Sequence, residues 1–189
     1  MKKVIFVIIA LVGLAGCSSM DKTRQVKLHG LIMDADGKGV SSYRIMKGEK
    51  QVGLSNDNGY FDVDAVYGDG VELVLQKKNW ETVMFSEEKC DLTKLYVFKV
   101  RSVDSVCREI EEKLDARAFD KTESIFETLP EEMKNYPRIK YLRAVMLHNQ
   151  GKYAQALEIL KEDSITGLKE SKIEDFIKML EKKLEVNNG

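Results

Sequence analysis

The chain has 189 residues, of which 43% are hydrophobic and 32% are charged, a composition typical of folded globular proteins rather than disordered ones. Its 30 Lys and Arg residues against 31 Asp and Glu residues give a formal net charge of −1, so the charge balance does not indicate nucleic acid as a partner. The length is enough for one ordinary domain or two small ones.

Residues 1–16 have the layout of a secretory signal. A charged start of Lys2 and Lys3 precedes the apolar run 4–14, and small residues follow immediately before Cys17. The apolar run is shorter than the roughly 20 residues that a membrane-spanning helix needs. We therefore expect a cleaved signal rather than a transmembrane anchor.

Small residues followed at once by a cysteine resemble the lipobox of bacterial lipoproteins. The resemblance implies cleavage before Cys17, diacylation of its thiol and acylation of the new amine, and more than one acyl chain holds a protein firmly at a membrane. We expect residues 17–24 to be a linker after the lipidated Cys17, with the membrane as a partner through the lipid. Ser18 stands where enteric bacteria use Asp for inner-membrane retention, which implies the outer membrane rather than the plasma membrane, whereas a Gram-positive host would imply the plasma membrane.

Residues 25–101 form short alternating runs punctuated by Gly and Asn. In the run 61–65, Phe61, Val63 and Ala65 alternate with aspartates, as in a strand with one buried face. Asp and Gly in the segment 34–39 are typical of a tight turn. The pattern predicts an antiparallel β-sandwich of seven strands, placed at 26–32, 43–46, 51–54, 60–64, 71–76, 82–85 and 95–100.

This half resembles the carboxypeptidase regulatory-like domain, a transthyretin-like sandwich. The likeness is carried by Gly30, the turn 34–37 and the run 58–61, Asn-Gly-Tyr-Phe, and Asn79-Trp80 stand where the family has Gly-Tyr. Gly39 replaces the usual Pro of the first turn. The resemblance implies an accessory domain that binds or spaces other parts and carries no catalytic residue.

Residues 102–189 have helical periodicity instead. Apolar residues recur at three- and four-residue spacing and predict helices at 103–118, 121–129, 139–149, 153–161 and 171–186. The predicted fold class is therefore α+β, an N-terminal seven-stranded antiparallel β-sandwich followed by a C-terminal all-α domain.

The helical part resembles tetratricopeptide repeats. The separation of Phe119 from Tyr153, and likewise of Thr122 from Ala156, equals the period of that repeat. The segment 144–157 is similar to the inter-helix turn and second helix of a repeat. The resemblance implies a TPR-like helical-repeat domain that binds a peptide or a helix of a protein partner, with 171–186 as a capping helix.

No motif indicates catalysis, a metal site or a cofactor. Counting from Asp34, the twelfth position of a calcium loop is Ile45 rather than Glu, and His29 and His148 are the chain's two histidines, which show no zinc spacing. We expect turns and solvated strand faces to explain the acidic residues Asp34, Asp36, Asp57, Asp62 and Asp64. The chain also has no phosphate-binding glycine loop and no nucleophile elbow, so it is not expected to be an enzyme.

Two cysteines remain besides Cys17. Cys90 and Cys107 flank the boundary between the two halves of the chain. Export permits a disulfide that would pin this boundary. The alternative is a pair of unbridged, buried thiols, and spacing alone does not decide between the two.

These features together predict a non-catalytic, membrane-anchored adaptor of the bacterial cell envelope that binds an envelope protein. Tyr141, Arg143, Met146 and Leu147 are its candidate partner-binding residues, although burial between helices explains Tyr141 and Met146 equally well. One alternative is a sandwich that binds a ligand such as a glycan through an exposed aromatic patch, formed by Tyr43, Tyr60 or Trp80. A second alternative is an accessory subunit or divergent hydrolase, which needs a cleft with convergent polar groups.

Overall fold

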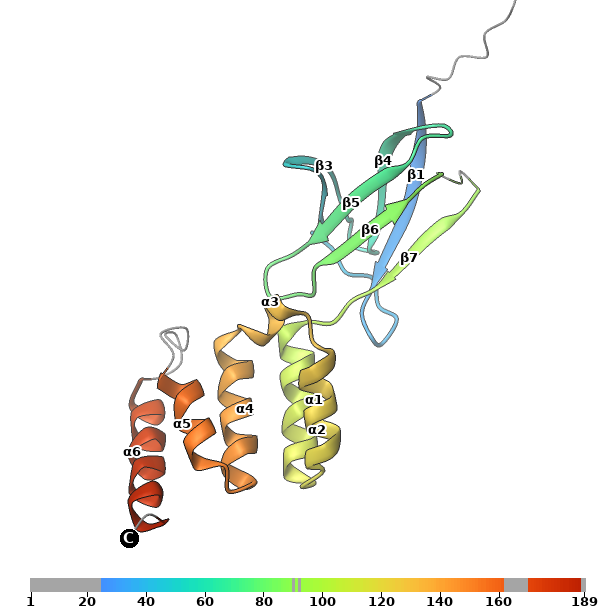
Figure 1. Ribbon diagram of the computed structural model, residues 1–189. Coiled ribbons are helices and arrows are strands. Elements are labelled where there is room, and N and C mark those ends of the chain that lie inside the picture. The colour runs from blue at the N-terminus through green and yellow to red at the C-terminus, as the bar shows by residue number, and fades with distance from the viewer. Residues whose placement is uncertain (1–24, 90, 92, 162–169, 188–189) are drawn as a thin grey trace, which may run out of the picture.

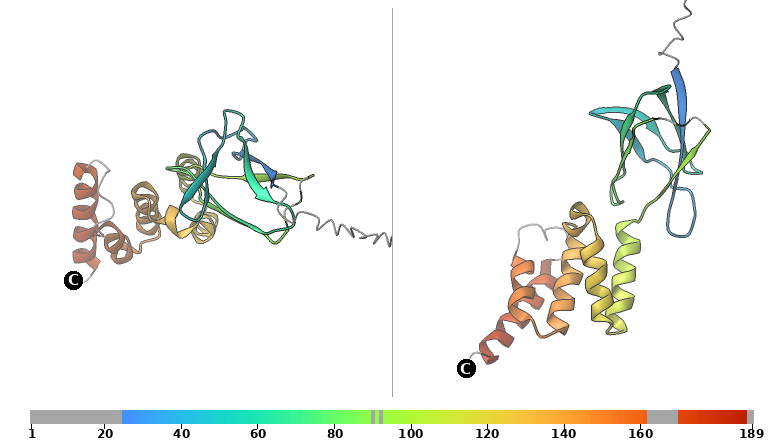
Figure 2. Two further views of the ribbon diagram at one scale, coloured as in Figure 1. Left: turned by 90° about the horizontal axis from the view of Figure 1, so that it is seen from above. Right: turned by 45° about the vertical axis from the view of Figure 1, so that its right-hand side comes forward.

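The computed structural model describes residues 25–89, 91, 93–161 and 170–187. Figure 1 shows two parts joined end to end, a β-domain that ends with Lys99 and a helical domain that begins at Val103. The further views in Figure 2 show the same arrangement. The predicted signal and the linker with Cys17 lie outside the described residues. Within the described residues, no helix is both long and apolar enough to cross a bilayer.

Seven strands of the described chain form two sheets. In the three-stranded sheet, β1 (Gln25–Met33) lies between β4 (Tyr60–Val66) and β7 (Leu95–Lys99). The four-stranded sheet has the strand order β3-β2-β5-β6, formed by β3 (Lys50–Leu54), β2 (Arg44–Lys47), β5 (Val71–Gln76) and β6 (Val83–Glu87).

The prediction of an antiparallel seven-stranded sandwich is wrong, because β7 pairs with β1 in parallel. His29 lies opposite Leu95 and Met33 lies opposite Lys99. The helical domain follows β7 and lies at the C-terminal end of β1, so both strands run toward the same end (Figure 1). Alternation of side chains reports which face of a strand is buried and does not report the direction of its neighbour.

The core of the β-domain lies between the inner faces of the two sheets. β4 alternates buried and exposed residues, with Phe61, Val63 and Ala65 inside. Phe85 of β6 packs against Tyr96 and Phe98 of β7, with ring centroids 4.9 Å and 5.3 Å away. β6 is an edge strand of one sheet and β7 is an edge strand of the other, so these aromatic contacts close the domain along that side.

The described helical domain contains six helices around one apolar core. Fully buried side chains from four helices, Ile110, Met133, Ile139, Met146 and Leu180, make its centre. The helices are α1 (Val103–Asp115), α2 (Phe119–Thr128), α3 (Glu131–Lys134), α4 (Pro137–Asn149), α5 (Tyr153–Lys161) and α6 (Glu170–Asn187).

The helical domain also corrects the prediction of TPR-like repeats. A short extra helix, α3, stands between the two helical hairpins α1–α2 and α4–α5. α4 packs mainly on α1 and α5 and meets α2 only at a few positions. The described helices therefore do not form two consecutive repeats with a cap. Any amphipathic bundle needs apolar residues at helical spacing, so a few matches at the period of a repeat do not by themselves define one.

The two domains are joined by main-chain hydrogen bonds as well as by the chain itself. The loop 77–82, between β5 and β6, lies against residues 101–103 at the start of α1. Glu81 N donates to Arg101 O at 3.0 Å, and Val103 N donates to Asn79 O at 2.9 Å. The α1 N-terminus is fixed locally too, because Ser102 accepts a hydrogen bond from Ser105 N in a capping box.

A second set of contacts ties the same loop to α3. Thr82 N donates to Glu132 Oε1 at 2.7 Å, and Asn79 N donates to the Tyr136 hydroxyl at 3.2 Å. Inside the β-domain the Tyr43 hydroxyl donates to Glu81 O at 2.7 Å. Burial, reinforced by the nearby Glu81 and Glu132 carboxylates, raises the pKa of Tyr43. The junction is therefore held from both sides of the loop.

Candidate functional site: a groove along α4

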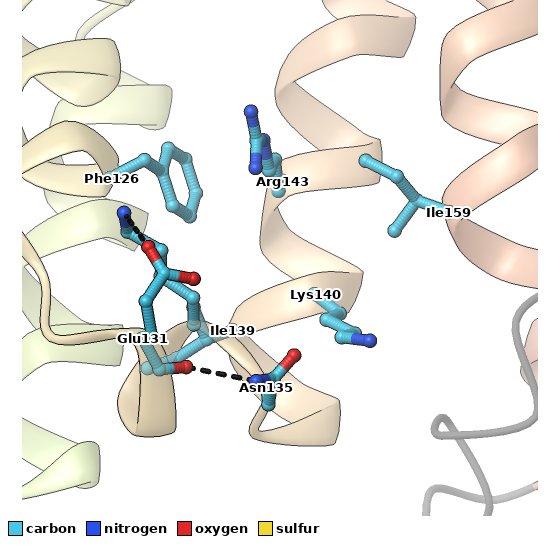
Figure 3. Close-up of a pocket in the computed structure, with 8 residues that line it drawn as sticks. Phe126, Glu131, Asn135, Ile139, Lys140, Arg143 and Ile159 are labelled. Carbon is cyan, nitrogen blue, oxygen red and sulfur yellow. Dashed lines mark hydrogen bonds and ion pairs between the residues drawn. The ribbon is translucent and has the colours of Figure 1, made fainter.

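An open groove runs along α4 between α2 and α5. It consists of two adjoining hollows of about 550 Å³ and 160 Å³, and Arg143 and Ile159 line both of them. Figure 3 shows the smaller hollow, with Phe126 on one side, Arg143 in the middle and Ile159 on the other side. Because they share two lining residues, the hollows are parts of one surface, which we call the α4 groove.

α4 supplies the floor of the groove. Ile139, Arg143 and Leu147, followed by Gln150 at the C-cap, recur every three or four residues and so lie on one helix face. With a rise of 1.5 Å per residue, the floor from Ile139 to Gln150 extends roughly 17 Å. This length suits about three turns of a helix or about five residues of extended chain.

The smaller hollow has an apolar interior and a polar rim. Phe126 and Ile139 are buried, and Ile159 packs at the edge of the helical core. On the rim, Lys134 Nζ donates to Glu131 Oε1 at 2.7 Å, and Asn135 Nδ2 donates to the Glu131 main-chain oxygen at 3.0 Å (Figure 3).

Arg143 occupies the boundary between the two hollows. The residue is exposed, and its guanidinium carbon lies 6.0 Å from the centre of the Phe126 ring. Within the described part of the chain, no carboxylate forms an ion pair with Arg143. An arginine held over an aromatic ring keeps its hydrogen-bond donors available to a further group.

The larger hollow lies toward the C-terminus of α4, and its lining is more acidic than that of the smaller hollow. Asp120 and Glu123 of α2 and Glu158 of α5 line it, together with Lys152. The Gln150 side-chain oxygen in this wall is buried and accepts no hydrogen bond from the described residues. This end of the groove is therefore rich in hydrogen-bond acceptors.

The four predicted partner-binding residues do not share one surface. Arg143 and Leu147 line the groove, as the α4 face requires. Met146 is fully buried in the helical core. Tyr141 points elsewhere and packs against Phe176 of α6 with ring centroids 5.8 Å apart. Half of the predicted set therefore belongs to the groove, and the other half stabilises helix packing.

Sequence reasoning missed the residues that α2 and α5 contribute. Phe126, Ile159 and Glu158 come from the helices on either side of α4. Their apolar or charged character fits an ordinary amphipathic helix, so no local signal separates them from core or solvent positions. The groove arises only when α2 and α5 are placed on the same side of α4.

The predicted cysteine roles remain predictions. Cys17 and Cys90 lie outside the described residues, which leaves both the lipidation and the Cys90–Cys107 bridge untested. Cys107 has a free thiol and is fully buried in the core between α1 and its neighbours. Burial raises the pKa of this thiol to about 11, so at neutral pH it is protonated and a poor nucleophile.

The aromatic residues considered for a glycan site do not form one exposed patch. Tyr43 is fully buried, and its ring meets the half-buried Trp80 edge to face near the domain junction, with ring centroids 6.2 Å apart. Tyr60 lies on the three-stranded sheet instead, where its hydroxyl and His29 Nδ1 form a hydrogen bond. The observation that would favour a glycan-binding sandwich is therefore missing among these three residues.

Three of the acidic residues considered above, Asp34, Asp62 and Asp64, have local partners. Asp34 Oδ1 accepts hydrogen bonds from Asp36 N and Lys38 N at 3.0 Å and 2.8 Å, which fixes the turn after β1. Lys27 pairs with Asp64 at 2.8 Å, and this hydrogen bond is the main cause that raises the pKa of Lys27. The described residues include no group of three or more His, Cys, Asp or Glu side chains placed to hold a metal ion.

Comparison with known proteins adds little to this geometry. No family model matches the chain, and no curated protein is detectably similar in sequence. Among solved structures, two mutants of a type II cohesin–X-dockerin complex from Acetivibrio cellulolyticus align over 41% and 42% of this chain and 58% and 59% of theirs. Sequence identities of 12% and 13% and TM-scores of 0.34 and 0.35 are too low to support any argument about fold or function.

Proposed function

We propose that this protein is a non-catalytic, lipid-anchored adaptor of the bacterial cell envelope, and that it binds a partner protein in the α4 groove. The observation that carries this proposal is the groove itself. The two hollows share an exposed Arg143 and the half-buried Ile159, and an arginine beside an apolar side chain is typical of protein-binding surfaces.

The position of the proposed anchor fits this role. Cys17 precedes β1 by eight residues, a stretch that extends at most roughly 28 Å. Figure 1 shows that β1 begins at the end of the β-domain that is remote from the helices. In this arrangement the β-domain acts as a spacer, and the α4 groove is presented away from the membrane. We propose the outer membrane as the site of anchoring.

The anchor is tested by Cys17→Ser in the full chain. Loss of the acylation site leaves the precursor uncleaved by the lipoprotein pathway and abolishes labelling with a palmitate analogue. Unchanged processing together with unchanged membrane association of the variant would rule out the lipid anchor.

Partner binding in the groove is tested by filling it with a large side chain. Gln155 is exposed and lines the larger hollow, so Gln155→Trp blocks the groove without disturbing the core. Ser124→Trp is the matched control, because Ser124 is exposed on α2 and lines neither hollow. Each variant is chemically cross-linked to its neighbours in intact envelopes and then captured. The measurement is the amount of each envelope protein that is captured with it.

We expect at least one envelope protein that wild type and Ser124→Trp capture equally to be lost with Gln155→Trp. Equal recovery of every captured protein by the two tryptophan variants would show that the groove is not the binding surface. Circular dichroism of both variants establishes that the fold is retained.

A further inference from the structure

We infer that the α4 groove selects a partner segment in which a carboxylate side chain lies next to an apolar side chain. In this arrangement the carboxylate binds Arg143, and the apolar side chain enters the smaller hollow between Phe126, Ile139 and Ile159. The inference rests on the proposed function and adds to it the chemistry of the partner.

Arg143 differs from the arginines that hold the fold together. Arg138 of α4 bonds Asp104 at 3.1 Å and Glu111 at 3.0 Å, and Arg101 lies 3.5 Å from Glu81 at the domain junction. Those guanidinium groups already have carboxylate partners. Arg143 instead lies over the Phe126 ring at the edge of a hollow and has no ion pair within the described chain.

The ring under Arg143 prepares it for a planar anion. At 6.0 Å the guanidinium is within cation–π range of the Phe126 ring, and its parallel N–H donors stay available to bind a carboxylate. A carboxylate accepts two such hydrogen bonds in a bidentate pair, which a neutral amide or a hydroxyl does not. The geometry of Arg143 therefore favours Asp or Glu on the partner.

The smaller hollow supplies the second half of the recognition. Its volume of about 160 Å³ corresponds to about five water molecules, enough for one medium aliphatic side chain and too little for a folded element. The half-buried Ile159 offers apolar contact at its wall, and the buried Phe126 and Ile139 lie beneath its base. Arg143 lines the same hollow, so the two partner side chains must be close neighbours.

The charges around the smaller hollow agree with an acidic partner. Among its charged lining residues Lys134 already pairs with Glu131, so the positive charge offered to a partner is that of Arg143. The opposite end of the groove carries Asp120, Glu123 and Glu158. This asymmetry orients the bound segment, with its acidic residue at Arg143 and its apolar residue on the α3 side of Arg143.

The inference is tested by selection from a phage-displayed library of random 12-residue peptides on the mature full chain in detergent. Twelve residues in a helix span about 18 Å, close to the length of the groove floor. We expect enriched peptides to carry Asp or Glu within one helical turn of Leu, Ile, Met or Phe. Enrichment of peptides without an acidic residue would overturn the inference.

Affinities of the enriched peptides then separate the roles of charge and fit. Loss of a hydrogen-bonded ion pair predicts about 10- to 100-fold weaker binding to Arg143→Glu, with a smaller loss for Arg143→Lys. Arg108→Glu is the control, since Arg108 is exposed on α1 and lines neither hollow. Peptides with Lys in place of the acidic residue should bind Arg143→Glu better than they bind wild type.

The two proposals fail in different ways. If Gln155→Trp abolishes peptide binding but Arg143→Glu leaves it unchanged, the groove is a docking site and the acidic chemistry is wrong. If neither substitution changes binding of any selected peptide, the groove itself is rejected.

Discussion

Gly59 in the β-domain lies so close to main-chain atoms of neighbouring segments that no side chain fits at this position. Gly59 has a φ of +79° in the turn before β4, and its oxygen accepts a hydrogen bond from Ile32 N at 2.8 Å. A Cβ at this position would lie 2.1 Å from Ile32 O and 2.8 Å from Val40 N. Both neighbours are main-chain atoms, so they cannot move aside as a flexible side chain would.

We therefore expect Gly59→Ala to lower the free energy of unfolding by more than about 3 kcal/mol, from left-handed strain plus a main-chain clash. Gly68→Ala is the matched control, because Gly68 has a φ of +83° and nothing lies within 4 Å of its would-be Cβ. The control should lose only about 1 to 2 kcal/mol. Urea denaturation measures both, and equal losses would contradict the role of the contacts at Gly59.

Cys107 makes the stability of the helical domain fall as pH rises through the alkaline range. Burial raises the pKa of its thiol from 9.0 to about 11 in the folded protein. Between these values the unfolded chain has lost the proton while the native chain keeps it, so stability is complete below pH 9 and falls as pH rises to 11. One pKa unit corresponds to about 1.4 kcal/mol, so the shift from 9.0 to about 11 gives a total loss of roughly 3 kcal/mol.

The measurement is denaturation at pH 8 to 11 in a Cys90→Ala background, compared with the same chain carrying Cys107→Ala. The difference between the two stability curves should narrow as pH rises through this range. In the same background, thiol reagents at pH 8 should modify Cys107 only after denaturant is added. Rapid modification of the native protein would show that the thiol is not buried.

At the scale of elements, periodicity predicts most boundaries well and the connections poorly. The strand expected at 60–64 is found as β4 at Tyr60–Val66, and the helix expected at 153–161 is α5 at Tyr153–Lys161. α3 was missed because four residues between Pro130 and Pro137 are too short to show a period. The parallel pairing of β1 with β7 was missed because it depends on where the chain goes after β7.

The candidate site shows the same division. Arg143 and Leu147 were predicted only as members of a set of four residues on the helix expected at 139–149, of which Tyr141 and Met146 lie elsewhere. Phe126 and Ile159 were not predicted, since each belongs to a different helix and meets the groove only through tertiary packing. The sequence predicted the helix that lines the groove but not which face of that helix does so, because α4 has too little amphipathic pattern to mark one face.

At the scale of the whole molecule, the junction decides whether the groove has a fixed direction relative to the β-domain. The loop between β5 and β6 contacts both the start of α1 and the segment around α3. Two separate points of attachment resist bending better than a single connecting chain. If Cys17 anchors the protein, a stiff junction transmits the orientation of the β-domain to the groove.

A stiff junction predicts one narrow distance between spin labels on the two domains. The labels are attached at Tyr67→Cys in the β-domain and Lys121→Cys on α2, which both replace exposed residues. Cys90→Ala removes a competing thiol, and Cys107 is not labelled because it is buried. Glu132→Ala with Tyr136→Phe removes both side-chain partners of the loop while keeping the ring of Tyr136. Their hydrogen bonds together stabilise the docking of the domains by about 2 kcal/mol.

Pulsed electron spin resonance on the mature chain should show that this double variant broadens the distance distribution. Glu131→Ala is the control, because Glu131 is the neighbour of Glu132 on α3 but pairs with Lys134 inside the helical domain. The control should leave the distribution as narrow as in wild type. Equal widths in all three proteins would mean that the contacts of residues 101–103 with the loop hold the domains without α3, whereas a broad distribution in wild type would mean that the groove has no fixed direction.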